Sequence, residues 1–341
     1  MPTRDPILER ARWNGARFVA GSPAGGYESW FQRANHPSRP LAFWIRYTIF
    51  APRDRPDRAV GELGAVFFDG ERQRVVAVKE EHPLAQCAFA GRGLSAKIAG
   101  AHLNDKGLEG FASRGSHTLR WALRYASDRP PLLLLPERFY AGGFPKAKAL
   151  VGAPLARFDG TLEVDGEKLS IDGWIGSQNH NWGSEHTARY AWGQVAGFDD
   201  APDAFLELST ARVRVGPVLT PPMTVLALVV DGEELRFSGI GRALRARARY
   251  APFQWSFETG DRNTTISGVI AAPRWSFVAL PYGNPPGGIK TCLNSKLARC
   301  DVTLERRGRP TRTLSTASRA AFEMLGDEAA PAGVQPLDAP A

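Results

Sequence analysis

The segment "GELGAVFFDGERQRVVAVKE", residues 61–80, carries the sequence signal that indicates the fold class. Two runs rich in Val and Phe flank Asp69-Gly70, and an Asp-Gly pair supplies the positive φ angles that a tight hairpin turn needs. The same signal recurs at Asp165-Gly166, in "GTLEVDGEKLSIDG", and at Asp231-Gly232, in "LALVVDGEELRFSG". Hairpins are therefore predicted in both halves of the chain, which favours antiparallel sheets.

The rest of the chain has the same character. Thirty-five glycines and 26 prolines punctuate short runs of β-branched and aromatic residues, a pattern typical of many-stranded antiparallel proteins. Helical periodicity is weak except at Pro6–Arg12 and Thr316–Leu325, where short terminal helices are predicted. An all-β fold with about sixteen to twenty strands is expected, too many for one small barrel.

Two sheet-rich units, each closed or nearly closed, fit this strand count better than one. We place the boundary near residues 183–190, so that one unit spans 1–185 and the second spans 186–325. The tail, residues 326–341, is rich in Ala and Pro, has no periodic core face, and is predicted to be disordered.

Composition narrows the partners and the compartment. The net charge of +8 is scattered through the 341 residues, and no zinc-finger spacing, RNP-like motif or basic helix accompanies it. Nucleic-acid binding is therefore not expected, whereas loose peripheral attraction to a membrane surface stays open. The N-terminus has no apolar leader and the longest apolar run is too short to span a bilayer, so a cytoplasmic protein is expected. The oligomeric state is left open.

The three cysteines argue against a disulfide scaffold and for a reducing compartment. If Cys292 and Cys300 lie on one continuous strand, eight residues at about 3.3 Å each hold them roughly 26 Å apart, too far to bridge.

Residues 170–199, "SIDGWIGSQNHNWGSEHTARYAWGQVAGFD", concentrate the residue types that chemistry needs. Regular alternation places Asp172 and Trp174 on one strand face, and the following "SQNHNWG" is predicted to leave the strand as a polar corner. Beyond it, Tyr190, Trp192 and Gln194 alternate with small residues. These three side chains either line a ligand cavity inside a barrel or fill a core.

His180 and Trp182 lie two residues apart, so on an extended strand they point the same way. A histidine can transfer protons near neutral pH and an indole face can stabilise a cation. Alternatively, His180 and its flanking asparagines only satisfy backbone groups at a corner. A metal set of His180, Glu185 and His186 is possible by residue type, but its spacing matches no familiar site, and no metal is predicted.

Five segments together resemble one superfamily, which contains carotenoid hydratases (hydroxyneurosporene synthases), AttH-like proteins and, more distantly, tocopherol cyclases and lipocalin-like pericyclases. They are "GGYESWFQRANHP" with "LAFWIRYTIFAP" (25–52), "GELGAVFFDG" (61–70), "DGWIGSQNHNWG" (172–183), "YAWGQVAGF" (190–198) and "TCLNSKLARCDVTLE" (291–305). The resemblance covers roughly residues 20–306. It implies two packed lipocalin-like (calycin) barrels and a large apolar ligand, an isoprenoid or a polyketide, at the mouth of a barrel or between the two.

The resemblance also implies a reaction without a metal or organic cofactor. Family hydratases protonate an isolated alkene, hold the resulting cation against aromatic rings and let water capture it. His180 and Trp182 match the functional His-x-Trp of these hydratases. The Tyr-x-Asp pair of the family has its nearest counterpart in Phe205-Leu206-Glu207, so the tyrosine hydroxyl is missing.

An alkene is a very weak base, so its acid must be a carboxyl group kept protonated by burial, which raises the pKa. Asp172, Glu185 and Glu207 are the candidates, and Asp172 and Glu207 are assigned as catalytic together with His180 and Trp182. Further cavity residues follow from their positions in the resembling segments. They are Trp174, Asn179, Tyr190, Trp192, Gln194, Tyr27, Glu28 and Trp44, with Arg46 as a further neighbour.

Two functions remain open at this point. The first is a cofactor-independent hydratase or cyclase of an apolar isoprenoid or polyketide. The second is a non-catalytic, lipocalin-like lipid carrier or stress-related protein, in which the His180 motif is a structural latch.

Overall fold

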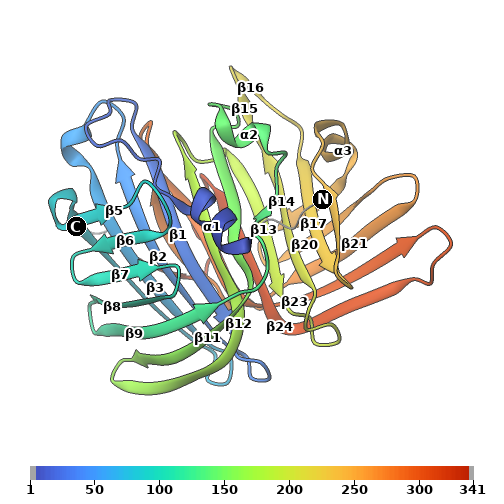
Figure 1. Cartoon of the computed structure of the whole chain (residues 1–341), viewed down its shortest axis with the longest axis horizontal. Coiled ribbons are helices and arrows are strands. Elements are labelled where there is room, and N and C mark those ends of the chain that lie inside the picture. Colours follow the sequence, from blue (N-terminus) through green and yellow to red (C-terminus); the bar gives the residue numbers. More distant parts are fainter. Residues whose placement is uncertain (1–4, 338–341) are drawn as a thin grey trace.

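The chain folds into two large antiparallel sheets that lie side by side (Figure 1). The computed structural model describes residues 5–337. The first sheet has the order β4-β3-β2-β1-β12-β11-β9-β8-β7-β6-β5, and the second has the order β18-β17-β14-β13-β24-β23-β21-β20-β19. Both are strongly curved and lipocalin-like, so the all-β prediction is confirmed.

The first sheet is built from residues between Gly26 and Gly183. Its strands are β1 (Gly26–Asn35), β2 (Leu41–Ala51), β3 (Val60–Asp69), β4 (Arg74–Pro83), β5 (Cys87–Phe89), β6 (Ser95–Ile98), β7 (Ala101–Asn104), β8 (Gly107–Arg114), β9 (His117–Ala126), β10 (Leu132–Leu133), β11 (Ala147–Val164) and β12 (Glu167–Gly183).

The second sheet follows from Arg189 onward, and a short separate hairpin, β15–β16, projects from it. The strands are β13 (Arg189–Ala196), β14 (Phe205–Arg212), β15 (Arg214–Val215), β16 (Val218–Leu219), β17 (Met223–Val230), β18 (Glu233–Phe237), β19 (Arg247–Ala251), β20 (Gln254–Gly260), β21 (Thr264–Ala271), β22 (Val278–Gly283), β23 (Ile289–Arg306), β24 (Arg312–Gly326) and β25 (Gln335–Pro336).

Helices are short and peripheral. They are α1 (Pro6–Asn14), α2 (Arg138–Ala141) and α3 (Ile240–Arg245), with 3-10 turns at Pro56–Arg58, Leu84–Gln86 and Arg274–Ser276. The helix predicted at Pro6–Arg12 is confirmed by α1, in which the Asp5 carboxylate accepts from the Ile7 N–H and caps the first turn.

Each sheet curls around its own apolar core. In the first, Ser113 on β8 donates from its backbone N–H to Glu80 on β4, 2.7 Å away, which draws the two sides of the sheet together. Its lumen is filled by large side chains such as Phe43, Phe158 and Trp174. In the second, Trp255, Phe277 and Phe322 belong to the corresponding core.

A third apolar cluster joins the two sheets. Phe31 and Trp44 of the first sheet pack with Trp192 and Leu280 of the second. The Asn35 amide also donates to the Lys296 carbonyl, 2.7 Å away across the interface. The interface is therefore continuous with both cores, and it contains polar as well as apolar contacts.

The hairpin signals mark real turns. Asp165-Gly166 joins β11 to β12 and Asp231-Gly232 joins β17 to β18, each pair with positive φ at both residues. Asp69-Gly70 opens a longer turn, in which the positive φ falls on Gln73.

Two sequence predictions near the C-terminus are wrong. Residues 316–325 form part of β24, because pairing with β13 and β23 overrides the helix-favouring Ala, Glu and Leu content. Of the tail predicted to be disordered, residues 326–337 are described: β25 pairs with β22, and Val334 is buried in the second core. Residues 338–341 lie outside the described residues.

The three cysteines are free. Cys292 and Cys300 both lie on β23 and are buried, and Cys87 is partly buried.

Candidate functional site

The segment "SQNHNWG" lies within β12 and continues it without a break to Gly183. The predicted polar corner is wrong, because this segment pairs on both sides: His180 lies opposite Trp30 of β1 and opposite Leu150 of β11. The backbone groups are therefore satisfied by the sheet, and the polar side chains are free to make buried contacts of their own.

Side chains of β12 alternate between two environments. Gln178, His180 and Trp182 face the N-terminal segment 13–18, whereas Ser177 and Asn179 face the second sheet. The strand thus separates two polar clusters, which we name the His180 cluster and the Glu207 cluster.

In the His180 cluster the imidazole is held between two acceptors. Its Nε2 lies 2.8 Å from Glu28 Oε1 and its Nδ1 lies 3.0 Å from the Trp13 carbonyl. The Glu28 carboxylate also accepts from the backbone N–H groups of Arg17 and Phe18, at 2.8 Å each. The Trp13 carbonyl oxygen can only accept, so Nδ1 of His180 carries a proton and donates to it.

Aromatic rings and one cation surround this imidazole. Trp30 stacks on it and Trp182 lies tilted beside it, each with ring centroids 4.8 Å from that of His180. The Arg17 guanidinium covers the Trp182 ring at 3.9 Å. Burial lowers the pKa of His180, although the hydrogen bond to Glu28 opposes the shift. His180 is fully buried, so in this conformation its ring is closed off from solvent.

The Glu207 cluster lies between the sheets and begins with a ring of amides. Ser177 Oγ donates to Gln194 Oε1 at 2.6 Å, and Gln194 Nε2 donates to Asn179 Oδ1 at 2.8 Å. The Asn179 amide closes the ring by donating to Ser177 Oγ at 2.9 Å. The polar residues of β12 therefore fix the orientation of Gln194 on β13.

Glu207, on β14, receives two hydrogen bonds from β13. Trp192 Nε1 donates to Oε1 at 2.7 Å and Gln194 Nε2 donates to Oε2 at 2.8 Å. Burial nevertheless dominates and raises the pKa of Glu207 to about 7, with the hydrogen bonds and Arg33 acting in the opposite direction. Near neutral pH this carboxyl group is therefore present in both its acid and its base form.

Arg33 lies nearby on β1 and is completely buried. Its Nη2 donates to the Arg319 carbonyl at 2.8 Å, whereas its Nε and Nη1 have no partner among the described residues. Burial lowers the pKa of Arg33 to about 9. Burying a guanidinium whose donors lack partners costs free energy. Packing alone therefore does not explain why an arginine occupies this position.

A second buried acid completes the cluster. Lys296 Nζ lies 2.7 Å from Glu323 Oε1 and points over the rings of Trp44 and Trp192, at 5.9 and 5.5 Å. Burial lowers the pKa of Lys296, while Glu323 opposes this shift.

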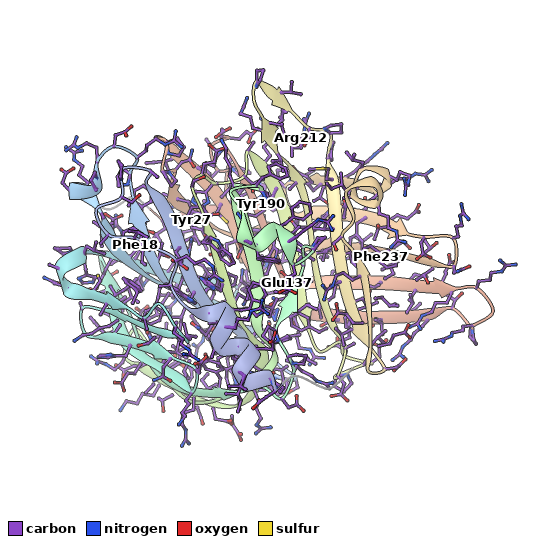
Figure 2. All side chains as sticks on the ribbon, turned by 45° about the horizontal axis from the view of Figure 1, so that its top comes forward. Phe18, Tyr27, Glu137, Tyr190, Arg212 and Phe237 are labelled. Carbon is purple, nitrogen blue, oxygen red and sulfur yellow. The ribbon has the colours of Figure 1, made fainter. Side chains whose placement is uncertain are left out.

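Aromatic side chains from both sheets meet at one end of the interface. Tyr27 stacks on His186 with centroids 3.9 Å apart, His186 stacks on Tyr282, and the Arg46 guanidinium lies 4.2 Å from the Tyr282 ring. Figure 2 labels Tyr27 and Tyr190, which come from the two different sheets. Burial lowers the pKa of His186 to about 3, so its ring is neutral.

The structure therefore divides the predicted site residues between the two clusters. His180, Trp182 and Glu28 come together on one side of β12. The inter-sheet region holds Glu207, Asn179, Tyr190, Trp192, Gln194, Tyr27 and Trp44. Contrary to the expectation for a barrel cavity, Tyr190, Trp192 and Gln194 face the other sheet, and the small residues between them face the barrel core. A side chain at Gly193 would meet Ile270 at 2.5 Å and Trp255 at 3.0 Å.

Two predicted residues lie elsewhere. Asp172 is exposed and pairs with Arg157 at 3.2 Å, so it lacks the burial that the proposed acid requires. Trp174 is buried in the core of the first barrel. The two do not share a face because Gly173, with φ of +61°, interrupts the regular alternation of β12.

Sequence reasoning missed the residues that complete both clusters. Arg33, Lys296, Glu323 and Tyr282 come from four different strands, and Trp13 and Arg17 come from the N-terminal segment. No local pattern identifies them, because their roles arise only when distant strands pack together.

Metal ligation has no support from the arrangement of the described residues, among which no group of three or more His, Cys, Asp and Glu is placed to hold an ion. His180, Glu185 and His186 make separate contacts, with Glu28, Lys146 and Tyr27 respectively. Within residues 5–337, no helix is long and apolar enough to cross a membrane.

Comparison with known proteins agrees with the two-barrel fold. No protein-family model matches the sequence. An uncharacterized protein of Mycobacterium tuberculosis is 26% identical over 317 residues, which cover 92% of this chain and 88% of the relative.

Among solved structures, a protein of Nitrosomonas europaea described provisionally as AttH has a TM-score of 0.56 at 14% identity, covering 92% of this chain and 98% of its own. Kievitone hydratase from Nectria haematococca has a TM-score of 0.55 at 11% identity, covering 94% of this chain and 98% of its own. CghA has a TM-score of 0.53 at 12% identity, covering 94% of this chain and 97% of its own. The chain therefore has the lipocalin-like fold that an AttH-type protein and a hydratase also adopt.

Proposed function

We propose that this protein is a cofactor-independent hydratase or cyclase that protonates an alkene of an apolar isoprenoid or polyketide. The observation that carries the proposal is Glu207, a carboxyl group with a pKa of about 7, buried between the sheets and hydrogen-bonded to an indole. Its environment fulfils the requirement for an acid that is still protonated near neutral pH. The likeness to kievitone hydratase supports the reaction class.

In the proposed reaction Glu207 donates its carboxyl proton to an alkene carbon. A C–H bond forms, the π bond breaks, and the adjacent carbon becomes a cation while Glu207 becomes a carboxylate. Water then adds to the cation, and the proton it loses returns to Glu207. In a cyclase the capturing group is instead a second alkene of the same substrate, and proton loss from the ring restores Glu207.

The surroundings of Glu207 suit an apolar substrate. Phe31, Trp44, Trp192 and Leu280 belong to one apolar cluster between the sheets. The indole faces stabilise a transient cation by cation–π attraction. Lys296 lies over two of these rings, and its positive charge would repel a substrate cation there. Its ion pair with Glu323 reduces this repulsion.

His180 acts in this proposal as a positioning residue. It lies on the opposite face of β12 from Glu207, and the two sides are connected through Asn179 and Gln194. By holding Glu28 and the Trp13 carbonyl, His180 fixes the strand from which Asn179 reaches Gln194. Trp182 supports the same side by packing against Tyr140 and Arg17.

One observation favours the second function, a lipid carrier. Every ring nitrogen of His180 already has a partner, and the ring is fully buried, as expected of a latch that ties segment 13–18 to the first barrel. In a carrier the Glu207 cluster would only hold the sheets together.

The first experiment identifies the ligand. The purified protein is extracted with organic solvent and any co-purified lipid is identified by mass spectrometry. That lipid is then incubated with wild-type protein, Glu207→Gln and His180→Ala, and both binding and conversion are measured.

We expect Glu207→Gln to bind the lipid normally and to lose at least 100-fold in conversion, the scale of a lost general acid. A Glu207→Asp variant should recover part of this loss, because it restores the proton. His180→Ala should lower stability and slow conversion without changing its pH profile. Conversion by Glu207→Gln at the wild-type rate would refute the assignment, and lipid binding without conversion by the wild type would favour the carrier.

A further inference from the structure

Helix α3 and the strand after it form an exposed surface that the site described above does not use. Ile240 and Leu244 are 52% and 47% exposed, whereas Ala243 between them is buried. About half of the surface of each of these two side chains faces solvent. They are therefore available to another apolar phase.

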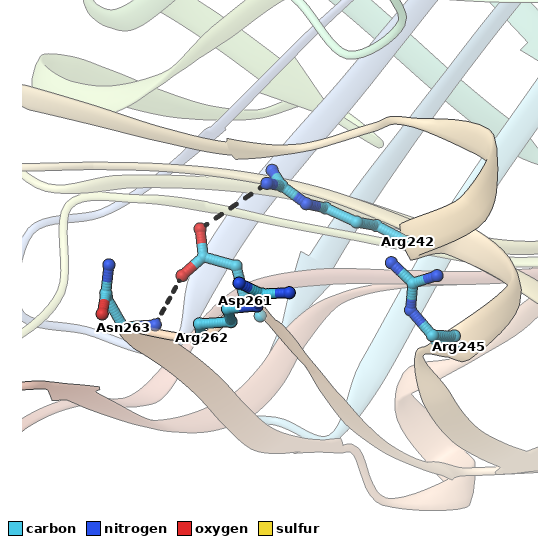
Figure 3. A pocket seen from close by; sticks show the side chains of 6 residues that line it. Arg242, Arg245, Asp261, Arg262 and Asn263 are labelled. Atoms are coloured by element: carbon cyan, nitrogen blue, oxygen red, sulfur yellow. Dashed lines mark hydrogen bonds and ion pairs between the residues drawn. The ribbon is translucent and has the colours of Figure 1, made fainter.

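Arginines lie close to these two apolar residues in the sequence and line a hollow beside the helix. Arg242, Arg245 and Arg262 line an open hollow of about 740 Å³ beside the helix, together with Asp261 and Asn263 (Figure 3). Arg247 and Arg249, on β19, are also exposed. The segment 239–249 contains four arginines and no acidic residue.

The single acid that lines the hollow is already engaged. Asp261 accepts from the backbone N–H groups of Asn263 and Thr264, at 2.9 and 3.0 Å, and lies 3.8 Å from Arg242. In the described part of the chain no acid pairs with Arg245 or Arg262, so the hollow carries a net positive charge. Guanidinium groups in this arrangement suit phosphate oxygens, which they bind through paired N–H donors.

A second exposed apolar element lies at the same end of the second sheet. The β15–β16 hairpin carries Val215 and Val218, which are 52% and 63% exposed, and Figure 1 shows it projecting at the end where α3 lies. Apolar tips beside cationic side chains are typical of surfaces that rest on a bilayer, where apolar groups enter the acyl boundary and cations meet lipid phosphates.

We propose that this face, defined by α3, β19 and the Arg242–Arg245–Arg262 hollow, docks on the surface of an anionic phospholipid bilayer. The hollow receives lipid phosphate, and Ile240 and Leu244 insert beside it. Nucleic acid shares the phosphate chemistry but offers no apolar phase for these two side chains. The docking does not depend on the reaction proposed for Glu207.

The test is sedimentation of the full chain with vesicles of phosphatidylcholine alone or of phosphatidylcholine mixed with phosphatidylglycerol, an anionic lipid. Two variants remove the two halves of the surface, Arg245→Glu with Arg262→Glu and Ile240→Ser with Leu244→Ser. The matched control replaces two exposed arginines of the first barrel, Arg92→Glu with Arg124→Glu. It changes the net charge by the same amount as Arg245→Glu with Arg262→Glu. Circular dichroism checks that each variant is folded.

We expect the wild type to sediment with the anionic vesicles and to be released by added salt. Each surface variant should lose at least tenfold in vesicle affinity, and the control should lose less than twofold. The proposal is overturned if the control loses as much as the surface variants, if neither surface variant weakens binding, or if the wild type binds duplex DNA but not vesicles. None of these outcomes depends on turnover, so failure here is distinguishable from failure of the proposed reaction.

Discussion

Glu207 and Glu28 are both almost fully buried, yet their environments differ in kind. Glu28 accepts from two backbone N–H groups and faces His180, so it is held by donors on several sides. Glu207 has two side-chain donors, and burial outweighs them. Glu207 is therefore suited to donate a proton near neutral pH.

The raised pKa of Glu207 makes a prediction about stability. The folded protein keeps the Glu207 proton up to about pH 7, whereas the unfolded chain loses it near its ordinary pKa of about 4.5. The contribution of this group is therefore fully present below pH 4.5 and is lost as the pH rises through 7. A shift of this size corresponds to about 3 kcal/mol.

The side chain at position 207 cannot ionise in the Glu207→Gln variant. As the pH rises from 4.5 to 8, the free energy of unfolding of the wild type should therefore fall by about 3 kcal/mol relative to that of the variant. Urea unfolding at several pH values measures the difference. Glu305→Gln, at an exposed position on β23, is the control and should show no such trend. A constant difference between Glu207→Gln and the wild type across this range would show that the pKa of Glu207 is not raised.

At the scale of elements, β12 is the strand on which both clusters depend. It lies between β1 and β11, and at Gly176 it leaves no room for a side chain against the β1 backbone. A Cβ atom there would collide with the Arg33 carbonyl oxygen and lie 2.6 Å from the Ala34 Cα. Both obstacles are backbone, so the neighbouring strand would have to move.

Gly176→Ala should therefore destabilise the protein by about 3 kcal/mol or more, the upper range for overpacking. Gly100→Ala is the matched control, because a Cβ at Gly100 meets nothing within 4 Å, and its effect should stay within about 0.5 kcal/mol. Thermal or urea unfolding measures both. Equal stability of the two variants would mean that β12 and β1 are not as close as described.

The elements themselves were predictable where the signal is local. Asp165-Gly166 and Asp231-Gly232 mark hairpins because a two-residue turn constrains its own backbone. The turn-forming residues of segment 177–183 predict a corner, because the sequence does not show that these side chains have buried partners such as Glu28 and Gln194. The sequence also does not show that Gly173 has a positive φ, and the irregularity at this residue places Asp172 on the surface.

At the scale of the whole molecule, the pairing of two barrels was predictable from the number of strand signals, whereas the interface was not. Arg33 and Asn35 reach the second sheet from β1, and their partners lie more than 250 residues away in sequence, at Arg319 and Lys296. Such contacts leave no periodic trace in a single sequence. Glu207, Tyr27, Glu28 and Trp44 are predicted from the sequence, whereas Arg33, Lys296, Glu323 and Tyr282, which lie on four different strands, are not.

The interface also predicts how the molecule unfolds. If the second barrel unfolded alone, the first would expose Phe31 and Trp44, and its buried Arg33 would lose the Arg319 carbonyl as a partner. If the first barrel unfolded alone, the second would expose Trp192 and Leu280. That cost couples the barrels, so differential scanning calorimetry should show a single transition whose van't Hoff enthalpy matches the calorimetric enthalpy. Two resolved transitions would instead show that each barrel is stable on its own.

Asn35→Ala tests the same coupling from a single side chain. It removes the hydrogen bonds to the carbonyls of Lys296 and Ser318, at 2.7 and 3.2 Å, and leaves these acceptors unpaired inside the interface. The expected loss is about 2 kcal/mol, and it should shift the whole transition without splitting it. Gln254→Ala, an exposed amide on β20, should leave the transition where it is. Asn35→Ala could instead split the unfolding into an early transition of one barrel and a later transition of the other. That result would mean that the inter-sheet hydrogen bonds make the two barrels unfold together, and that the apolar cluster alone is too weak to couple them.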